Sequence, residues 1–159
     1  MKTKALLTIF AFLVSLFISA ETKALTSNEL PIRQATKQWS VKIDKPKEGN
    51  NLAKPEKGKF DTFSIEVENK GPDVATAEIY VFRDEPQSST KFSLFGSADG
   101  SIKNQNEAIS LAKSLNDGSP VRYSNLLLAN KATELEVEVI WTQKGAEGRP
   151  LKETFKFSN

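Results

Sequence analysis

Residues 60–69 read Phe-Asp-Thr-Phe-Ser-Ile-Glu-Val-Glu-Asn. From Phe63 to Val67, apolar and polar residues alternate, and a period of two is typical of a strand with one buried face. Residues 69–73 have the composition of a turn, and residues 74–82 resume the alternation. This stretch therefore predicts two successive strands joined by a tight turn.

Further segments of the chain extend this β-rich pattern. The same alternation predicts strands over residues 38–43, 120–129, 134–142 and 151–157, with a short strand over residues 91–95. The last two strands are expected to form a terminal hairpin. Residues 104–115 have helical spacing instead, with Asn104 and Glu107 in capping-box relation and a Gly at position 118 as a stop. The fold predicted over residues 38–159 is an immunoglobulin-like antiparallel β-sandwich with one inserted short helix.

The aromatic residues divide into an expected core group and an expected surface group. Trp39 and Trp141 lie in alternating strands, so we expect them to fill the core rather than to form a platform for glycans. Tyr80, Phe82 and Tyr123 are the candidates for an exposed aromatic patch.

The start of the chain has the order of an export signal. A basic start is followed by an apolar run over residues 5–20 and then by small residues. This order predicts a signal peptide over residues 1–24, cleaved after Ala20 or Ala24, and a secreted, extracellular protein. Retention at the cell wall is an open alternative. Residues 25–37 are polar and mixed, and we expect a loose N-terminal segment there.

Composition limits the chemistry of this chain. Its 159 residues include no Cys and no His, which excludes disulfides, a thiol nucleophile and the usual general base. The 22 basic and 20 acidic residues become equal in number once the leader is removed at either site, and this balance argues against a nucleic-acid partner. We therefore predict a protein that is not an enzyme and that carries no catalytic residues, no cofactor and no metal.

Charge is distributed unevenly along the chain. Residues 31–59 contain eight Lys/Arg and three acids, a net of +5, whereas residues 61–87 contain two Lys/Arg and seven acids, a net of −5. Lysines of the first region could contact an anionic wall polymer or a lipid surface. The alternative is a solvated loop that keeps the protein soluble, which is the commoner role of surface lysines. The candidate contact residues are Lys45, Lys47, Lys54, Lys57 and Lys59.

Acidic residues recur in two of the predicted strands, at Glu66 and Glu68 and at Glu134, Glu136 and Glu138. Calcium sites need six to eight oxygen ligands, usually supplied by loops. Because these residues alternate along strands, we expect them to point into solvent.

Two segments resemble bacterial immunoglobulin-like envelope domains. In residues 63–75 an alternating strand ends in Asn-Lys-Gly before the next strand, and residues 128–139 are similar to the penultimate strand of such domains. The chain also resembles camelysin-type exported proteins, which combine a signal peptide, a sandwich and a helical insertion, although it lacks their Ala-Phe-rich start. Both resemblances imply a sandwich at the bacterial cell envelope.

The amino-acid sequence is compatible with three functional hypotheses. The first is a secreted, non-enzymatic binding or structural protein that acts at the cell surface or in the medium, with an unknown protein or a cell-wall polymer as partner. The second is a secreted protease inhibitor that uses the loops over residues 83–104 or 143–150. The third is self-assembly into a matrix or fibre through an open edge strand.

Overall fold

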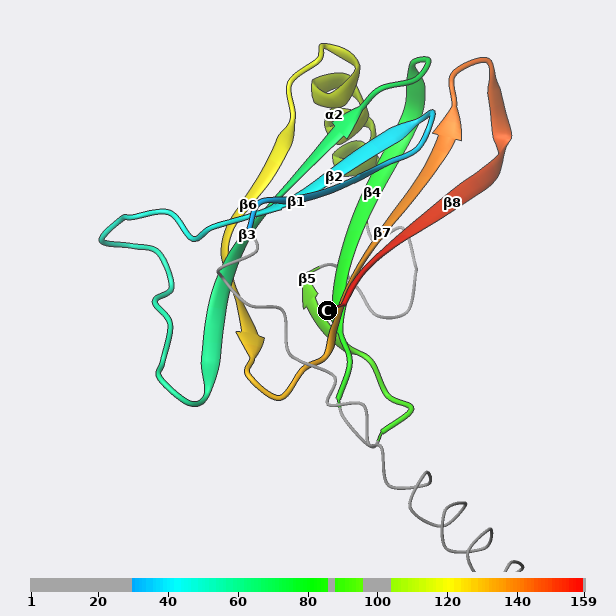
Figure 1. The fold of residues 1–159 in the computed structure, drawn as a ribbon. Coiled ribbons are helices and arrows are strands. Elements are labelled where there is room, and N and C mark those ends of the chain that lie inside the picture. Colours follow the sequence, from blue (N-terminus) through cyan, green and yellow to red (C-terminus); the bar gives the residue numbers. More distant parts are fainter. Residues whose placement is uncertain (1–29, 86–87, 96–103, 159) are drawn as a thin grey trace, which may run out of the picture.

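Two four-stranded antiparallel sheets stack into a β-sandwich in the computed structural model, which describes residues 30–85, 88–95 and 104–158 (Figure 1). The elements are β1 (Ile32–Ala35), β2 (Trp39–Asp44), β3 (Phe60–Asn69), β4 (Val74–Arg83), β5 (Phe92–Phe95), α2 (Gln105–Asn116), β6 (Val121–Ala129), β7 (Glu134–Gln143) and β8 (Ala146–Ser158). The first sheet has the order β1-β2-β3-β6 and the second β5-β4-β7-β8. The predicted signal peptide over residues 1–24 lies outside the described residues.

The predicted sandwich with one short helix is confirmed. Every strand pair is antiparallel, and β7 and β8 form the expected terminal hairpin, with Trp141 opposite Leu151 and Glu134 opposite Ser158. The turn between β3 and β4 carries the chain from the first sheet to the second. The clearest strand–turn–strand segment of the sequence therefore joins the two layers.

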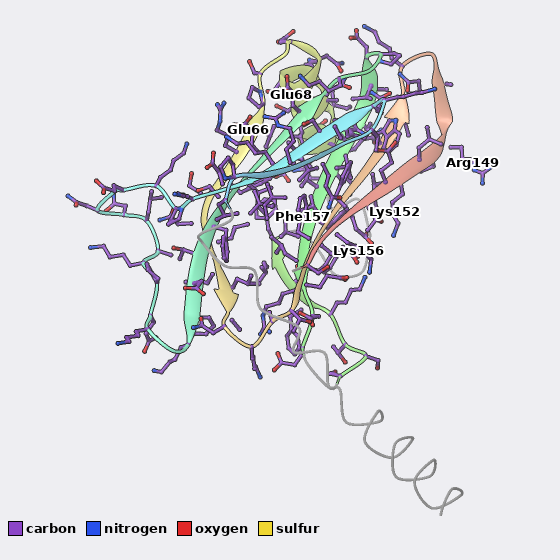
Figure 2. All side chains as sticks on the ribbon, viewed as in Figure 1. Glu66, Glu68, Arg149, Lys152, Lys156 and Phe157 are labelled. Atoms are coloured by element: carbon purple, nitrogen blue, oxygen red, sulfur yellow. The ribbon has the colours of Figure 1, made fainter. Side chains whose placement is uncertain are left out.

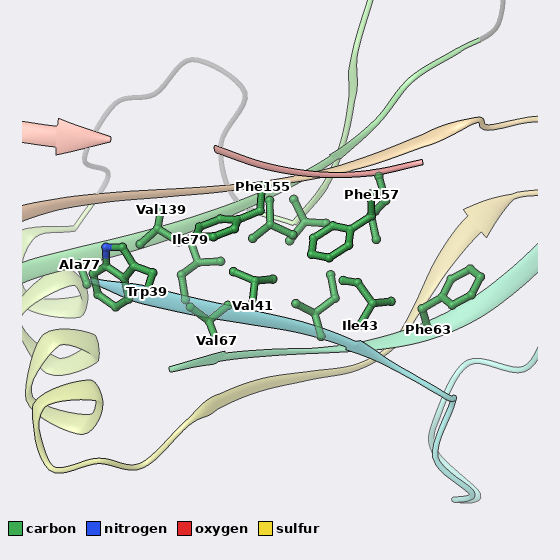
Figure 3. Packing of buried hydrophobic residues seen from close by; sticks show 14 of the residues in the cluster. Trp39, Val41, Ile43, Phe63, Val67, Ala77, Ile79, Val139, Phe155 and Phe157 are labelled. Atoms are coloured by element: carbon green, nitrogen blue, oxygen red, sulfur yellow. The ribbon is translucent and has the colours of Figure 1, made fainter. Parts of the chain in front are cut away.

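The core lies between the sheets and consists of the inward-facing residues of their strands (Figure 3). Val41 and Val67 of the first sheet and Val139 of the second are fully buried. Trp39 and Trp141 are buried as predicted, and their rings meet edge to face with centroids 5.5 Å apart and planes at 74°. Such an arrangement places the positive edge of one ring against the negative face of the other.

Residues 32–35 correct the expectation of a loose segment over residues 25–37. They form β1, which pairs with β2 in register from Ile32 opposite Ile43 to Ala35 opposite Ser40. β1 also reaches the second sheet, because the Gln34 side chain donates a hydrogen bond of 2.6 Å to the Lys156 carbonyl. Four residues with one large apolar side chain carry no periodic signal, so only the partner strands reveal this strand. Residues 25–29 lie outside the described part.

Helix α2 covers the part of β4 that the short strand β5 leaves unpaired. β5 pairs only with residues 81–83 of β4, and α2 packs against β4 through its buried face. The Asn116 side chain accepts a hydrogen bond of 3.0 Å from the Val74 N–H and donates one of 2.9 Å to the Val74 carbonyl. This amide takes the place of a neighbouring strand and protects an open edge. The predicted N-cap is confirmed, because the Asn104 side chain accepts a hydrogen bond from the Asn106 N–H.

Two residues of β8 test the assignment of the core. Phe157 is 2% exposed, whereas Leu151 on the same strand is 43% exposed. We expect Phe157→Ala to lower the free energy of unfolding by about 3–5 kcal/mol because it leaves a cavity between the sheets. Leu151→Ala is the control and should cost less than about 1 kcal/mol. Urea denaturation of the mature chain measures both values, and equal losses would contradict the assignment.

Candidate functional site: the lysine loop

The lysine loop, residues 45–59, connects β2 to β3 and forms the long excursion between these strands (Figure 1). All five candidate lysines lie in this loop and all are exposed. Leu52 is the loop's only large apolar residue. The loop is therefore hydrophilic, as its composition predicts.

Asn125 of β6 fixes the backbone of the lysine loop. Its Oδ1 accepts a hydrogen bond of 2.8 Å from the Lys47 N–H. Its Nδ2 donates one of 2.9 Å to the Lys47 carbonyl and one of 2.8 Å to the Ala53 carbonyl. Because a single amide holds both carbonyls, the outgoing and returning segments of the loop meet at this point. A loop that composition alone describes as irregular thus has a defined anchor.

The backbone of β6 bulges where Asn125 lies. Asn125 is 6% exposed and has a φ of 54°, a left-handed conformation that Asn tolerates better than most residues. The pairing of β3 with β6 shifts register between Phe63 and Ile65, opposite this residue. Since β3 separates β2 from β6, the loop crosses the outer face of β3 to reach Asn125. Thr62 and Ser64, which belong to that outer face, are accordingly buried.

The outer faces of both sheets carry paired charges. On the first sheet, the Arg122 Nε lies 2.8 Å from a Glu66 carboxylate oxygen and the Lys70 Nζ lies 2.7 Å from one of Glu68. On the second, Lys152 pairs with Glu138 and Lys156 with Glu134 in the same way, at 2.8 and 2.9 Å; Figure 2 labels residues of both faces. Three of these four pairs join neighbouring strands, the Lys70–Glu68 pair lies within two residues at the end of β3, and each pair cancels charge locally.

The lysine loop differs from both sheet faces in its charge pairing. Within the described ranges, Lys59 alone of the five lysines forms an ion pair, with Glu56 at 2.5 Å. Among the described residues, no carboxylate pairs with the remaining four, which are Lys45, Lys47, Lys54 and Lys57. We call these four the free lysines. The loop as a whole holds five lysines against two carboxylates, Glu48 and Glu56, and so has a net charge of +3.

Glu136 corrects the expectation that the acidic residues of β7 point into solvent. It is 2% exposed, and its two carboxylate oxygens lie 2.5 and 2.6 Å from the Lys91 Nζ. Lys156 approaches one of them at 3.3 Å. Burial acts to raise the pKa of Glu136, but hydrogen bonds and charge from the two lysines outweigh it, and the pKa lies below its ordinary value. Alternation could not reveal this, because Lys91 is distant in sequence.

The predicted exposed aromatic patch is wrong at Tyr80, which is 4% exposed and stacks on Phe82 with centroids 6.4 Å apart. Tyr123 is half-buried, and burial raises its pKa to about 12. Among the described aromatic residues, the exposed rings are those of Phe92 and Phe95 on β5. Phe95 lies against Tyr123 at 4.1 Å between centroids, so part of this surface is already covered within the molecule.

The structure describes only part of the two loops, residues 83–104 and 143–150, that a protease inhibitor could use. Of the loop over residues 83–104, residues 86–87 and 96–103 lie outside the described part. Residues 143–150 comprise the last residue of β7, a two-residue turn and the first residues of β8. Within the described ranges, no three acidic side chains gather into a group that could hold a metal ion. No helix in these ranges has the length and apolar character needed to cross a bilayer.

The anchor of the loop can be tested at Asn125. Asn125→Gly removes its three side-chain hydrogen bonds but tolerates the positive φ, so the Lys47 N–H should exchange with solvent faster while the fold stays intact. Asn125→Ala should cost about 1–2 kcal/mol more stability because Ala is strained in this conformation. Amide exchange followed by NMR gives the first result and urea denaturation the second. Unchanged exchange at Lys47 in Asn125→Gly would contradict the anchoring role.

The ion pairs of Glu136 predict a pH dependence of stability. Its pKa is lower in the folded chain than the ordinary 4.5, so the unfolded state binds the proton more readily. The stabilisation is therefore present above about pH 4.5 and is lost as the pH falls through the folded-state pKa. Glu136→Gln should flatten the stability profile between about pH 5 and pH 3. A profile of unchanged slope would show that Glu136 does not contribute.

Two comparisons with known proteins give matches that cover most of this chain. A family model described as YozF-like secreted protein matches residues 23–159. The uncharacterized protein YozF of Bacillus subtilis (strain 168) is 48% identical over 143 residues, which cover 89% of this chain and 87% of that protein. No solved structure gives a significant match. The match to the family model over most of the chain, together with this relative, confirms the predicted secretion and shows that the chain belongs to the YozF-like secreted protein family.

Proposed function

We propose that this secreted chain is a non-enzymatic binding protein whose lysine loop holds an anionic polymer at the cell surface. The observation that supports the proposal most strongly is the contrast in charge pairing. The outer sheet faces carry several ion pairs, whereas Lys45, Lys47, Lys54 and Lys57 form none in the described part of the chain. The loop holds five lysines against Glu48 and Glu56, so an anion that approaches it meets an attractive field.

Anchoring of the loop favours binding for a second reason. A freely moving loop would lose conformational entropy when it is ordered on a ligand, and that loss weakens affinity. The Asn125 side chain already fixes the backbone at Lys47 and Ala53. The lysine side chains keep their freedom, but the segments that carry them are held before the ligand arrives.

The non-enzymatic part of the proposal is supported by the residue types of the chain. There is no His and no Cys, so a general base or nucleophile would have to come from a carboxylate, a lysine or a hydroxyl group. The most buried carboxylate, Glu136, is held by two lysines, and that of Asp84 accepts hydrogen bonds from Thr133 and Glu134. These contacts suit groups that stabilise the fold.

Strand order supports an immunoglobulin-like assignment as part of the proposal. Immunoglobulin-like sandwiches place strands A, B and E in one sheet and strands C and F, with G beside F, in the other. Strands β2, β3 and β6 follow the first order, and β4, β7 and β8 follow the second, with β5 added beside β4. Here β1 and helix α2 are additions to that pattern. Sandwiches of this kind commonly bind ligands through loops, as we propose for the lysine loop.

Binding to purified cell walls tests the proposal. We expect the mature chain to sediment with walls at about 50 mM salt and to be released at about 500 mM, because salt screens exposed charges. A loop variant with Gln in place of Lys45, Lys47, Lys54 and Lys57 should bind at least about tenfold more weakly. The matched control places Gln at four ion-paired lysines outside the loop: Lys70, Lys131, Lys144 and Lys152.

This control has the same net charge as the loop variant, so only the position of the change differs. Binding that survives in the control and is lost in the loop variant supports the proposal. Equal loss in both variants would mean that only net charge matters, and retention of binding in the loop variant would exclude the lysine loop as the contact surface. Circular dichroism of both variants checks that the sandwich is intact.

A further inference from the structure

We infer that the chain keeps the edge of β8 closed against a second copy of itself, so that the secreted protein stays monomeric. A strand that joined the second sheet of one molecule to that of another would have to approach this edge. Two features of the described chain obstruct the approach: side chains from β1 and the residue after it, which reach over β8, and a bulge that contains Pro150. This closure is independent of the lysine loop.

Among the described residues, β8 is the longest edge strand of the sandwich. The strands with a neighbour on one side only are β1 and β6 in the first sheet and β5 and β8 in the second. β1 and β5 have four residues each, and the pairing of β6 is interrupted opposite residues 63–65 of β3. β8 has 13 residues. Because an edge strand exposes unpaired backbone groups, a long one is the most favourable template for a partner strand.

The free edge of β8 carries the backbone groups of Lys152, Thr154 and Lys156. The Lys156 carbonyl accepts a hydrogen bond of 2.6 Å from the Gln34 side chain, so it points toward β1 and away from β7. In an antiparallel ladder the N–H and C=O of one residue point to the same side, and successive residues point to opposite sides. β8 pairs with β7 in continuous register over residues 151–158, so the alternation holds throughout this part of the strand.

Side chains from β1 and the residue after it lie across this edge. Gln34 occupies the Lys156 carbonyl, and the hydroxyl of Thr36, the residue after β1, donates a hydrogen bond of 2.7 Å to the Glu153 carboxylate. This hydroxyl is itself held in place, because it accepts a hydrogen bond of 3.0 Å from the Trp39 N–H. β1 in turn is fixed by its pairing with β2. A partner strand would therefore have to displace both contacts before it could pair with the C-terminal half of β8.

The N-terminal half of β8 is obstructed by a bulge. The register shifts between Trp141 and Gln143 of β7, where residues 147–150 of β8 lie opposite Thr142 alone. Extra residues of this kind bend a strand and interrupt its ladder. Pro150, the last residue of the bulge, has no N–H to donate to a partner. An approaching strand would therefore find a regular ladder only in the half of β8 that Gln34 and Thr36 cover.

An open-edge variant of the mature chain tests the inference. Gln34→Ala removes the contact with Lys156, and Pro150→Thr supplies an N–H in the bulge. We expect the unmodified protein to sediment as a monomer at every concentration, and the open-edge variant to sediment as a dimer as its concentration rises. Sedimentation is measured at about 500 mM salt, which screens the repulsion between the lysines of two facing β8 strands. A matched control makes the same exchanges at exposed positions outside β1 and β8, Gln105→Ala with Pro46→Thr, and should stay monomeric.

Amide exchange followed by NMR identifies the edge that is used. In the unmodified protein, the amides of Lys152 and Thr154 should exchange at least about tenfold faster than those of Leu151 and Glu153, which face β7. In the dimer of the open-edge variant, the amides of Lys152 and Thr154 should become protected. If the double variant does not fold, the same two measurements are made on Gln34→Ala alone, for which we expect a weaker dimer through the same edge.

Four results would overturn the inference. Dimerisation of the unmodified protein would show that its edges are not closed, and protected Lys152 and Thr154 amides in it would show that this edge is already occupied. An open-edge variant that keeps its circular dichroism spectrum and stays monomeric would show that Gln34 and Pro150 do not obstruct pairing. A variant dimer in which the Lys152 and Thr154 amides still exchange rapidly would place the contact on another edge.

Discussion

Apolar packing between the two sheets is the interaction on which every other feature of this chain depends. The inward rows of the strands, with the Trp39–Trp141 contact among them, form the core of a chain that has no Cys and therefore no disulfide. Because a strand that buries one face must expose the other, this packing also determines where the charged residues lie. Several of them form cross-strand ion pairs on the outer faces, as Arg122 does with Glu66 and Lys152 with Glu138.

The lysine loop differs from the outer sheet faces in how its charges are paired. Four of its lysines form no ion pair in the described part of the chain, whereas both sheet faces carry ion-paired lysines or arginines. One buried side chain, Asn125, connects the loop to the sandwich through three hydrogen bonds. Core packing thus fixes β6, β6 positions Asn125, and Asn125 positions the residues that we propose as the contact surface.

Much of the fold could be predicted from the sequence because strand alternation is a local signal. The alternation of apolar and polar residues in β3 and β7 indicates which face of each strand is buried, and Asn104 marks the N-terminus of the helix as its N-cap. β1 and the burial of Glu136 escaped prediction because both depend on partners far away in the chain. Glu136 is covered by Lys91, and β1 is held by β2 and by Lys156 of β8. The five lysines could be singled out by composition, whereas their anchor could not, since Asn125 lies inside a strand-like segment with no mark of its role.

The central claim is that ligand contact is confined to residues 45–59 and their anchor. The most direct measurement is amide chemical-shift mapping of the labelled mature chain during titration with soluble polymer released from cell walls. We expect the amide chemical shifts of Lys45, Lys47, Lys54, Lys57 and Asn125 to change, and those of residues on the outer faces of both sheets to stay the same. Shifts concentrated instead around Phe92, Phe95 and Tyr123 would contradict it and would move the binding surface to the edge formed by β5 and β6.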